Sequence, residues 1–261
     1  MVAAAAAFAL QATAGAQSTA PPQQVWDLEW ESPHCTISTG DQKDVALSFW
    51  MAPGDPDPEV YLIGSTARLP SGEKPISLTL LPGGPTYQPQ VETGLNKAGQ
   101  RVLRLTKLHE RFPGAFANST GMRVTSGDTT IAIPVAGAGE AVAAIKQCID
   151  AKLPEWGVDA KAFNALQTPP TDIDGRLWFT ANDYPREAVD NNETGTVVAR
   201  MAVDSSGKVT DCHVVVSRSP FLDEATCRIA RSRGRFNAAI GADGRPTAAQ
   251  RIVVVDFRLR P

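Results

Sequence analysis

The chain has 261 residues, of which 43% are hydrophobic and 20% are charged, a composition typical of a soluble globular protein with one large or two small domains. Its net charge of −3 gives no long-range attraction to nucleic acid, so we expect no nucleic-acid partner. No apolar run reaches the roughly 18 residues that a membrane-spanning helix needs.

The first sixteen residues differ from the rest. Residues 1–16 form a short apolar block that ends in Ala14-Gly15-Ala16, a pattern typical of an export signal that is cleaved before Gln17. A positively charged start is missing, so either Met1 is an internal start or a few residues were lost upstream. An Ala-rich disordered leader is the alternative to a signal peptide. The signal peptide predicts a location in the periplasm of the cell envelope.

The four cysteines favour the same compartment. An even number behind an export signal predicts two disulfides. Four cysteines allow three pairings, and their order along the chain favours Cys35 with Cys148 and Cys212 with Cys227. Buried free thiols are the alternative. Zinc is disfavoured because no Cys-x-x-Cys spacing occurs, and we predict no metal site and no cofactor.

Residues 25–153 carry repeated strand signals that are separated by turns rich in proline and glycine. Five strand-like stretches begin at Val45, Glu59, Ile76, Arg101 and Thr129. Their number and spacing predict a β-rich, sandwich-like module. The stretch 139–153 has helical composition and one apolar stripe, which predicts a helix that closes this module.

Residues 154–177 are interpreted as a helical segment followed by a linker. A short helix is expected from Asp159 to Leu166, with Asp159 as its N-cap. The next stretch, "QTPPTDIDG", is rich in turn-forming residues and predicts the linker.

Residues 178–261 show the clearest succession of elements. Pro185 suits the start of a short helix, and two alternating stretches around a turn at 204–207 predict a β-hairpin. Ser219 is a candidate N-cap for the helix that follows, and "AQRIVVVDFRLRP" predicts a final strand. The expected order is helix, strand, strand, helix, strand.

These residues resemble the C-terminal domain of TonB-type energy transducers from about Trp178 to Leu259. The resemblance is carried by "DYPREA", Gly195, "VDSSGKVTD", "LDEA" and "RF", in the order and at the spacing of the family. The chain departs from the family by lacking an aromatic residue near Gly234, a proline near Ala238 and a long proline-rich spacer. The resemblance implies an α+β chain, in which the sandwich-like module is followed by a small TonB-like domain with an antiparallel sheet.

The resemblance also gives a role to the last two cysteines. In such a domain, position 212 is a small apolar core position on a strand and position 227 is an apolar position on a helix. A Cys212–Cys227 disulfide would therefore cross-link the hairpin to the helix.

The last strand of the family lies at a sheet edge and receives the TonB box, a short extended segment of an outer-membrane transporter, by strand addition. Carried over to this chain, the peptide-binding edge strand consists of Arg251, Ile252, Val253, Val254, Val255, Asp256, Phe257, Arg258 and Leu259. Charged residues at 251, 256, 258 and 260 are expected to prevent aggregation of this edge.

The resemblance implies a periplasmic TonB-like protein that is not an enzyme and that acts as a component or modulator of energy-coupled transmembrane transport. Its implied partners are TonB-dependent outer-membrane transporters. ExbB- and ExbD-type inner-membrane partners would follow if a membrane anchor had been lost from the start. The alternatives are a soluble envelope adaptor, whose N-terminal module binds an unknown partner, and a periplasmic enzyme.

Two further features are interpreted as structural. The tryptophans at 26, 30, 50 and 178 favour core or inter-domain packing over a ligand platform. The basic run "RIARSRGR" favours a solvated helix face that complements the helix dipole.

Overall fold

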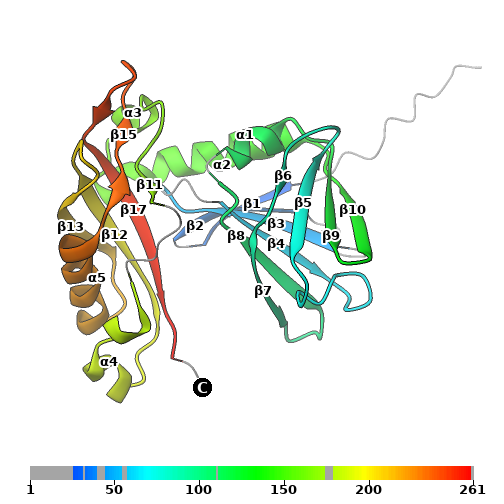
Figure 1. The fold of residues 1–261 in the computed structure, drawn as a ribbon, viewed down its shortest axis with the longest axis horizontal. Coiled ribbons are helices and arrows are strands. Elements are labelled where there is room, and N and C mark those ends of the chain that lie inside the picture. Colours follow the sequence, from blue (N-terminus) through cyan, green and yellow to red (C-terminus); the bar gives the residue numbers. More distant parts are fainter. Residues whose placement is uncertain are drawn as a thin grey trace, which may run out of the picture.

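A computed structural model describes residues 26–31, 33–39, 45–54, 58–109, 111–173 and 179–259. The expected signal peptide at 1–16 lies outside these residues, as do Trp178 and Arg260. The described residues form a β-rich N-terminal module and a smaller α+β C-terminal domain that lie side by side (Figure 1). The fold class expected from the sequence is confirmed.

The N-terminal module consists of two antiparallel sheets, with strand orders β1-β2-β3-β4-β8-β7 and β10-β9-β5-β6. The strands are β1 (Trp26–Glu31), β2 (His34–Thr39), β3 (Val45–Met51), β4 (Glu59–Gly64), β5 (Ile76–Leu81), β6 (Thr86–Tyr87), β7 (Gln90–Leu95), β8 (Arg101–Thr106), β9 (Gly121–Ser126) and β10 (Thr129–Pro134). All five stretches singled out in the sequence form strands at these places.

Alternation of apolar and polar residues explains how the two sheets share a core. Strands β4 and β5 each bury every second residue, and Leu62 and Leu78 are fully buried. Helix α1 (Phe112–Ala117) adds two aromatic rings to this core. The ring of Phe116 stacks on that of Phe49, with their centroids 5.5 Å apart.

Helix α2 (Ala138–Lys152) closes the module, as the sequence predicts. It buries Ile145 and Ile149 against the sandwich core, and a disulfide joins Cys148 to Cys35 on β2. The sequence separation of this disulfide is 113 residues, so it ties the beginning of the module to its last helix.

The segment after α2 remains in contact with the rest of the protein. It contains η1 (Leu153–Trp156), α3 (Ala160–Asn164) and β11 (Thr171–Asp172). The Asp159 side chain caps α3 by accepting a hydrogen bond from the Ala162 N–H. Part of the stretch expected to be a linker pairs with the C-terminal domain, because β11 pairs with β14 and the Ile240 N–H donates to the Thr168 carbonyl.

The C-terminal domain contains a three-stranded antiparallel sheet in the order β13-β12-β17. Its elements are η2 (Ala181–Asp183), α4 (Arg186–Asp190), β12 (Gly195–Val203), β13 (Val209–Val216), α5 (Pro220–Arg233), β14 (Phe236–Asn237), β15 (Ala239–Ile240), β16 (Pro246–Thr247) and β17 (Ala249–Phe257). The Ser219 side chain caps α5, with Pro220 in its first turn, as the sequence predicts.

A disulfide braces the outer face of this sheet. It joins Cys212 of β13 to Cys227 of α5, in the pairing that the chain order favours. Both residues belong to a cluster that also includes Met201 and Ala230, between the sheet and α5.

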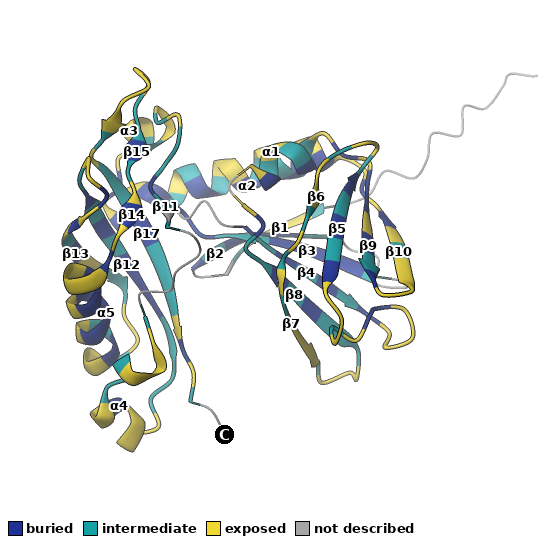
Figure 2. Ribbon diagram, viewed as in Figure 1, coloured by how far each residue is buried: buried dark blue, intermediate teal, exposed yellow. Residues whose placement is uncertain are grey.

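The opposite face of the same sheet packs against the N-terminal module. Val198 of β12 and Ile252 of β17 are fully buried and belong to the sandwich core cluster. Arg200 crosses the same boundary and donates hydrogen bonds to the carbonyls of Trp156 and Gly157. Figure 2 shows β12 and β17 largely in the colours of buried and half-buried residues. The two parts of the chain therefore share an apolar boundary.

Candidate functional site

Strand β17 lies at an edge of the C-terminal sheet. It pairs with β12 along its whole length, from Ala249 opposite Val203 to Phe257 opposite Gly195. Within the described ranges, no other strand pairs with it. The strand begins and ends two residues earlier than the predicted span, so Arg258 and Leu259 follow it.

The side chains of β17 alternate between two environments. Ile252 and Val254 pack on the N-terminal module, whereas Val253 and Val255 pack toward the side that carries α5. Phe257 contacts Tyr184, with ring centroids 5.4 Å apart. Because both faces are covered, the run of valines is explained by burial on both sides of the sheet.

The beginning of β17 is covered by Gly54, which follows β3. The Arg251 guanidinium donates a hydrogen bond to the carbonyl of Gly54 over 3.3 Å, and a Cβ atom on Gly54 would lie 2.6 Å from Cγ1 of Ile252. Arg251 is only 2% exposed, so it does not act as the exposed edge charge that the sequence suggests. Because Gly54 covers Arg251 and Ile252, a shorter part of the strand is accessible to a peptide than the sequence predicts.

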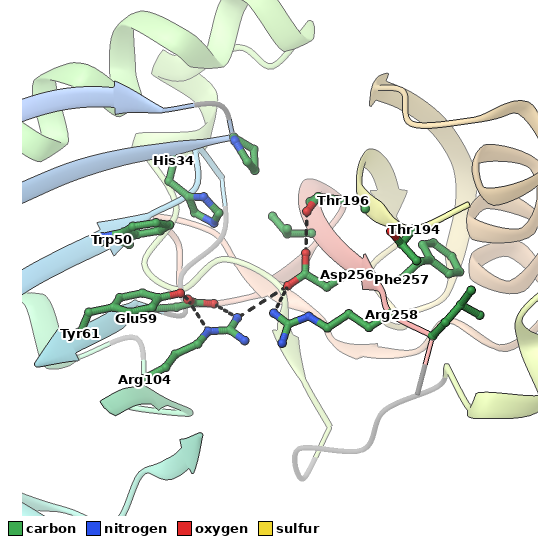
Figure 3. A pocket seen from close by; sticks show the side chains of 14 residues that line it. His34, Trp50, Glu59, Tyr61, Arg104, Thr194, Thr196, Asp256, Phe257 and Arg258 are labelled. Carbon is green, nitrogen blue, oxygen red and sulfur yellow. Dashed lines mark hydrogen bonds and ion pairs between the residues drawn. The ribbon is translucent and has the colours of Figure 1, made fainter. Parts of the chain in front are cut away.

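The end of β17 borders a cleft of about 520 Å³. One wall is the outer face of the six-stranded sheet, and the other is formed by the beginning of β12 and the end of β17. Figure 3 shows Asp256 and Arg258 extending from the second wall toward Arg104 on the first.

An ionic cluster joins the two walls of this cleft. Arg104 of β8 holds Glu59 of β4 with two hydrogen bonds, from Nε over 2.8 Å and from Nη2 over 2.5 Å. Its Nη1 donates to Glu92 of β7 over 3.0 Å, and its Nη2 lies 3.9 Å from Oδ2 of Asp256. Asp256 in turn accepts hydrogen bonds from Thr196 and Arg258.

The protonation states of this cluster follow from its contacts. Burial would raise the pKa of the Glu59 carboxyl, but the hydrogen bonds and charge of Arg104 and a hydrogen bond from Tyr61 outweigh burial and lower that pKa. Burial and the nearby charge of Glu59 raise the pKa of the Tyr61 phenol. Glu59 is therefore an anion at neutral pH, and the Tyr61 hydroxyl keeps its proton and donates a hydrogen bond to it over 2.8 Å.

Aromatic rings form the rest of the first wall. The ring centroids of Trp50 and Tyr61 are 4.5 Å apart, and those of Trp50 and His34 are 5.2 Å apart. These residues come from three neighbouring strands and lie on the outer face of the sheet. Trp50 lies between the two parts of the chain, as the sequence favours, and its side chain also lines the cleft.

The sequence did not identify any of the N-terminal residues of this site. A signal was present, because β4 and β8 carry aromatic or charged residues at positions that alternate with buried ones, and Trp50 of β3 follows the buried Phe49. Such alternation places Trp50, Tyr61 and Arg104 on one outer face, but it does not indicate what lies opposite that face.

Among the described residues, no three His, Cys, Asp or Glu side chains gather in a way that could hold a metal ion. None of the helices in the described ranges is long and apolar enough to cross a membrane.

Comparison with protein families identifies the family of the C-terminal part of the chain. Residues 180–259 match the family described as Gram-negative bacterial TonB protein C-terminal. Neither the curated proteins nor the solved structures contain a match to this chain. The matched range holds α4, β12, β13, α5 and β17, the order that the resemblance implied. Residues 180–259 are therefore a TonB-type C-terminal domain, which supports a TonB-like protein in energy-coupled transport.

Proposed function

We propose that the end of β17 binds an extended segment of a TonB-dependent outer-membrane transporter, the TonB box, by strand addition in the periplasm. An edge strand presents alternate N–H and C=O groups away from its neighbour, and an extended peptide can pair with them. The observation that carries the proposal is the cleft beside Val254–Leu259, because it leaves space in front of this part of the strand. The segment at Arg251–Ile252 contributes less, because Gly54 covers it.

The proposed role is binding, without catalysis. Each carboxylate of the cleft is held by a hydrogen-bonded arginine, so none of them is set apart as a base for proton transfer. The chain would act as a component or modulator of transport that holds the transporter segment. ExbB- and ExbD-type partners would be required for it to transmit force from the inner membrane.

The proposal is tested by hydrogen exchange on the full-length chain with a panel of synthetic TonB-box peptides. We expect slower exchange at alternate amides between Val253 and Leu259 when peptide is bound, because only every second residue faces the added strand. Little change is expected at Arg251 and Ile252.

A second measurement uses peptides with N-methylated residues. Each N-methyl group at a pairing position removes one hydrogen bond, and we expect a loss of about fivefold or more in affinity at every second position. A saturating peptide that leaves the exchange of all β17 amides unchanged would show that strand addition does not occur there.

A further inference from the structure

We propose that the outer face of the N-terminal sheet, at Trp50 and Tyr61, selects an extended peptide that carries a basic side chain. This inference rests on the proposed function, since it concerns the side chains of a peptide that pairs with β17. It gives the N-terminal module a role that the TonB-type domain does not supply, namely recognition of the bound sequence.

The geometry follows from the alternation of β-strands. An added strand would lie about 4.8 Å from β17, and every second side chain would point to the same face as Val254 and Asp256. That face borders the cleft whose other wall contains Trp50 and Tyr61. One side chain of the peptide would therefore enter the space between the two walls.

The charges in the cleft favour a cation. Among the described residues, the carboxylates of Glu59, Glu92 and Asp256 face the guanidinium groups of Arg104 and Arg258 in one connected cluster, which leaves an excess of one negative charge when the neighbouring His34 is neutral. The side chains of Arg104 and Glu59 are each 20% exposed and that of Asp256 is 33% exposed, so solvent screens these three charges less than it screens those of the more exposed Glu92 and Arg258. A lysine or arginine from the peptide would balance the excess, whereas a glutamate would increase it.

The aromatic wall favours the same class of side chain. The negative faces of tryptophan and tyrosine rings attract a nearby ammonium or guanidinium group. The module already contains this contact at another place, because the ammonium of Lys152 lies 4.9 Å from the ring centroid of Trp30. The ring of Trp50 is half-buried and lines the cleft together with the rings of His34 and Tyr61, which lie on either side of it.

The test uses a designed peptide with one guest position, Gly-Thr-Val-Thr-Xaa-Thr-Val-Thr-Gly-NH2, which carries fluorescein on its N-terminal amine and is titrated onto the full-length chain. The guests are lysine, norleucine, which has a similar length without charge, and glutamate. We expect lysine to bind about threefold to thirtyfold more tightly than norleucine, the range that a cation over an aromatic ring gives. Glutamate should bind more weakly than norleucine, and both differences should shrink in high salt.

Matched variants locate the selection. Trp50→Leu and Asp256→Asn should each reduce the preference for lysine, whereas Trp30→Leu, the same substitution outside the cleft, should leave it unchanged. Circular dichroism confirms that each variant is folded before its affinities are compared, and Asp256→Asn keeps the inference testable if Trp50→Leu does not fold.

The outcomes separate this inference from the proposed function. If TonB-box peptides protect β17 but the three guests bind equally, or the lysine peptide does not bind, the inference is wrong and the proposed function stands. If no peptide of either series protects β17, the proposed function fails and the inference fails with it. A preference for lysine that Trp50→Leu and Asp256→Asn both leave intact would place the selection elsewhere and overturn the inference.

Discussion

Arg104 is the residue at which the contacts of the cleft converge. Its guanidinium reaches carboxylates from β4, β7 and β17, and therefore from both walls. A planar group with five donors is suited to this position, because it can hold Glu59 with two bonds and still reach Glu92 and Asp256. Lysine would not replace it, since a single ammonium cannot satisfy this geometry.

The substitution Arg104→Met tests this role at the level of stability. Breaking a fully buried ion pair costs about 3–5 kcal/mol, and with partly exposed side chains we expect a loss of about 2 kcal/mol at neutral pH. Urea unfolding measures the loss. The exposed Arg123→Met on β9 is the control and should change the unfolding free energy by less than about 0.5 kcal/mol.

The pH dependence of this loss has a defined sign. The pKa of Glu59 is lower in the folded protein than its ordinary value of 4.5, so its contribution to stability is present above pH 4.5 and is lost as the pH falls through the lowered pKa. The difference between wild type and Arg104→Met should therefore shrink in acid. A difference that grew below pH 4.5 would contradict the assignment of the charge to Glu59.

Local residue roles could be predicted where the partner is close in sequence. Asp159 and Ser219 cap their helices as expected, because an N-cap accepts a hydrogen bond from a residue three positions later. The partners of Arg104 come from distant strands, and no local rule joins them. The expectation that Arg251 is an exposed charge at the sheet edge was wrong for the same reason, because Gly54, which is distant in sequence, covers its side chain.

At the scale of elements, α5 shows how its basic residues are used. The Arg231 guanidinium donates to the carbonyl of Cys212, and Arg233 pairs with Asp183 over 2.5 Å. Two arginines near the end of the helix therefore have partners within the C-terminal domain, which agrees with a structural role for this part of the basic run.

The corner after α5 explains a departure from the TonB family. A Cβ atom on Gly234 would lie 2.4 Å from the carbonyl oxygen of Ala230 and 2.7 Å from Cγ2 of Val209. No space remains for a bulky side chain at position 234, because the backbone there packs closely against the hairpin.

The two disulfides allow a prediction about their relative contributions. In the chain-entropy model, a loop of about 15 residues gives about 3 kcal/mol and one of about 100 residues gives about 4.7 kcal/mol. Replacing Cys212 and Cys227 together by alanine should therefore cost less than replacing Cys35 and Cys148, whose sequence separation is 113 residues instead of 15.

Guanidinium unfolding of the two double variants, followed by far-ultraviolet circular dichroism, measures both losses. Comparison of the two double variants controls for the removal of two sulfur atoms, since each lacks one disulfide. A larger loss for the pair at 212 and 227 would show that loop length does not determine the ranking in this protein.

Elements could be predicted where one pattern was sufficient. The alternation of residues gave the strands that begin at Val45, Glu59 and Ile76, and the hairpin at 204–207 followed from its turn residues. The short pairing of β11 with β14 could not be predicted, because two-residue strands carry no period.

At the scale of the whole molecule, the two parts of the chain are joined by a shared core. Val198 and Ile252 are buried in the sandwich cluster although they lie on strands of the C-terminal sheet. The sequence contained a sign of this arrangement, since "RIVVVDF" is nearly continuous in apolar residues, which is typical of a strand covered on both faces. It did not show that the second cover is the N-terminal module.

This boundary is tested most directly at Gly54, where the turn after β3 meets β17. Gly54 and Gly99 both have a φ of +74°, but a Cβ on Gly54 would lie 2.6 Å from Ile252, whereas a Cβ on Gly99 would have nothing within 4 Å. Gly99→Ala should therefore cost only the left-handed backbone strain, about 1–2 kcal/mol. Gly54→Ala should add an overpacking cost of about 1–3 kcal/mol.

Chemical denaturation of both variants gives the difference, and hydrogen exchange shows how the protein relieves the clash. If the two parts of the chain separate slightly, exchange should accelerate at Ile252 and at neighbouring amides of β17 in Gly54→Ala and should stay unchanged in Gly99→Ala. Equal losses in the two variants would mean that the turn moves without cost, and the packing of Gly54 on β17 would then not limit access to the strand. Faster exchange confined to Gly54→Ala would instead show that the contact of Gly54 with Ile252 protects the beginning of β17 from solvent.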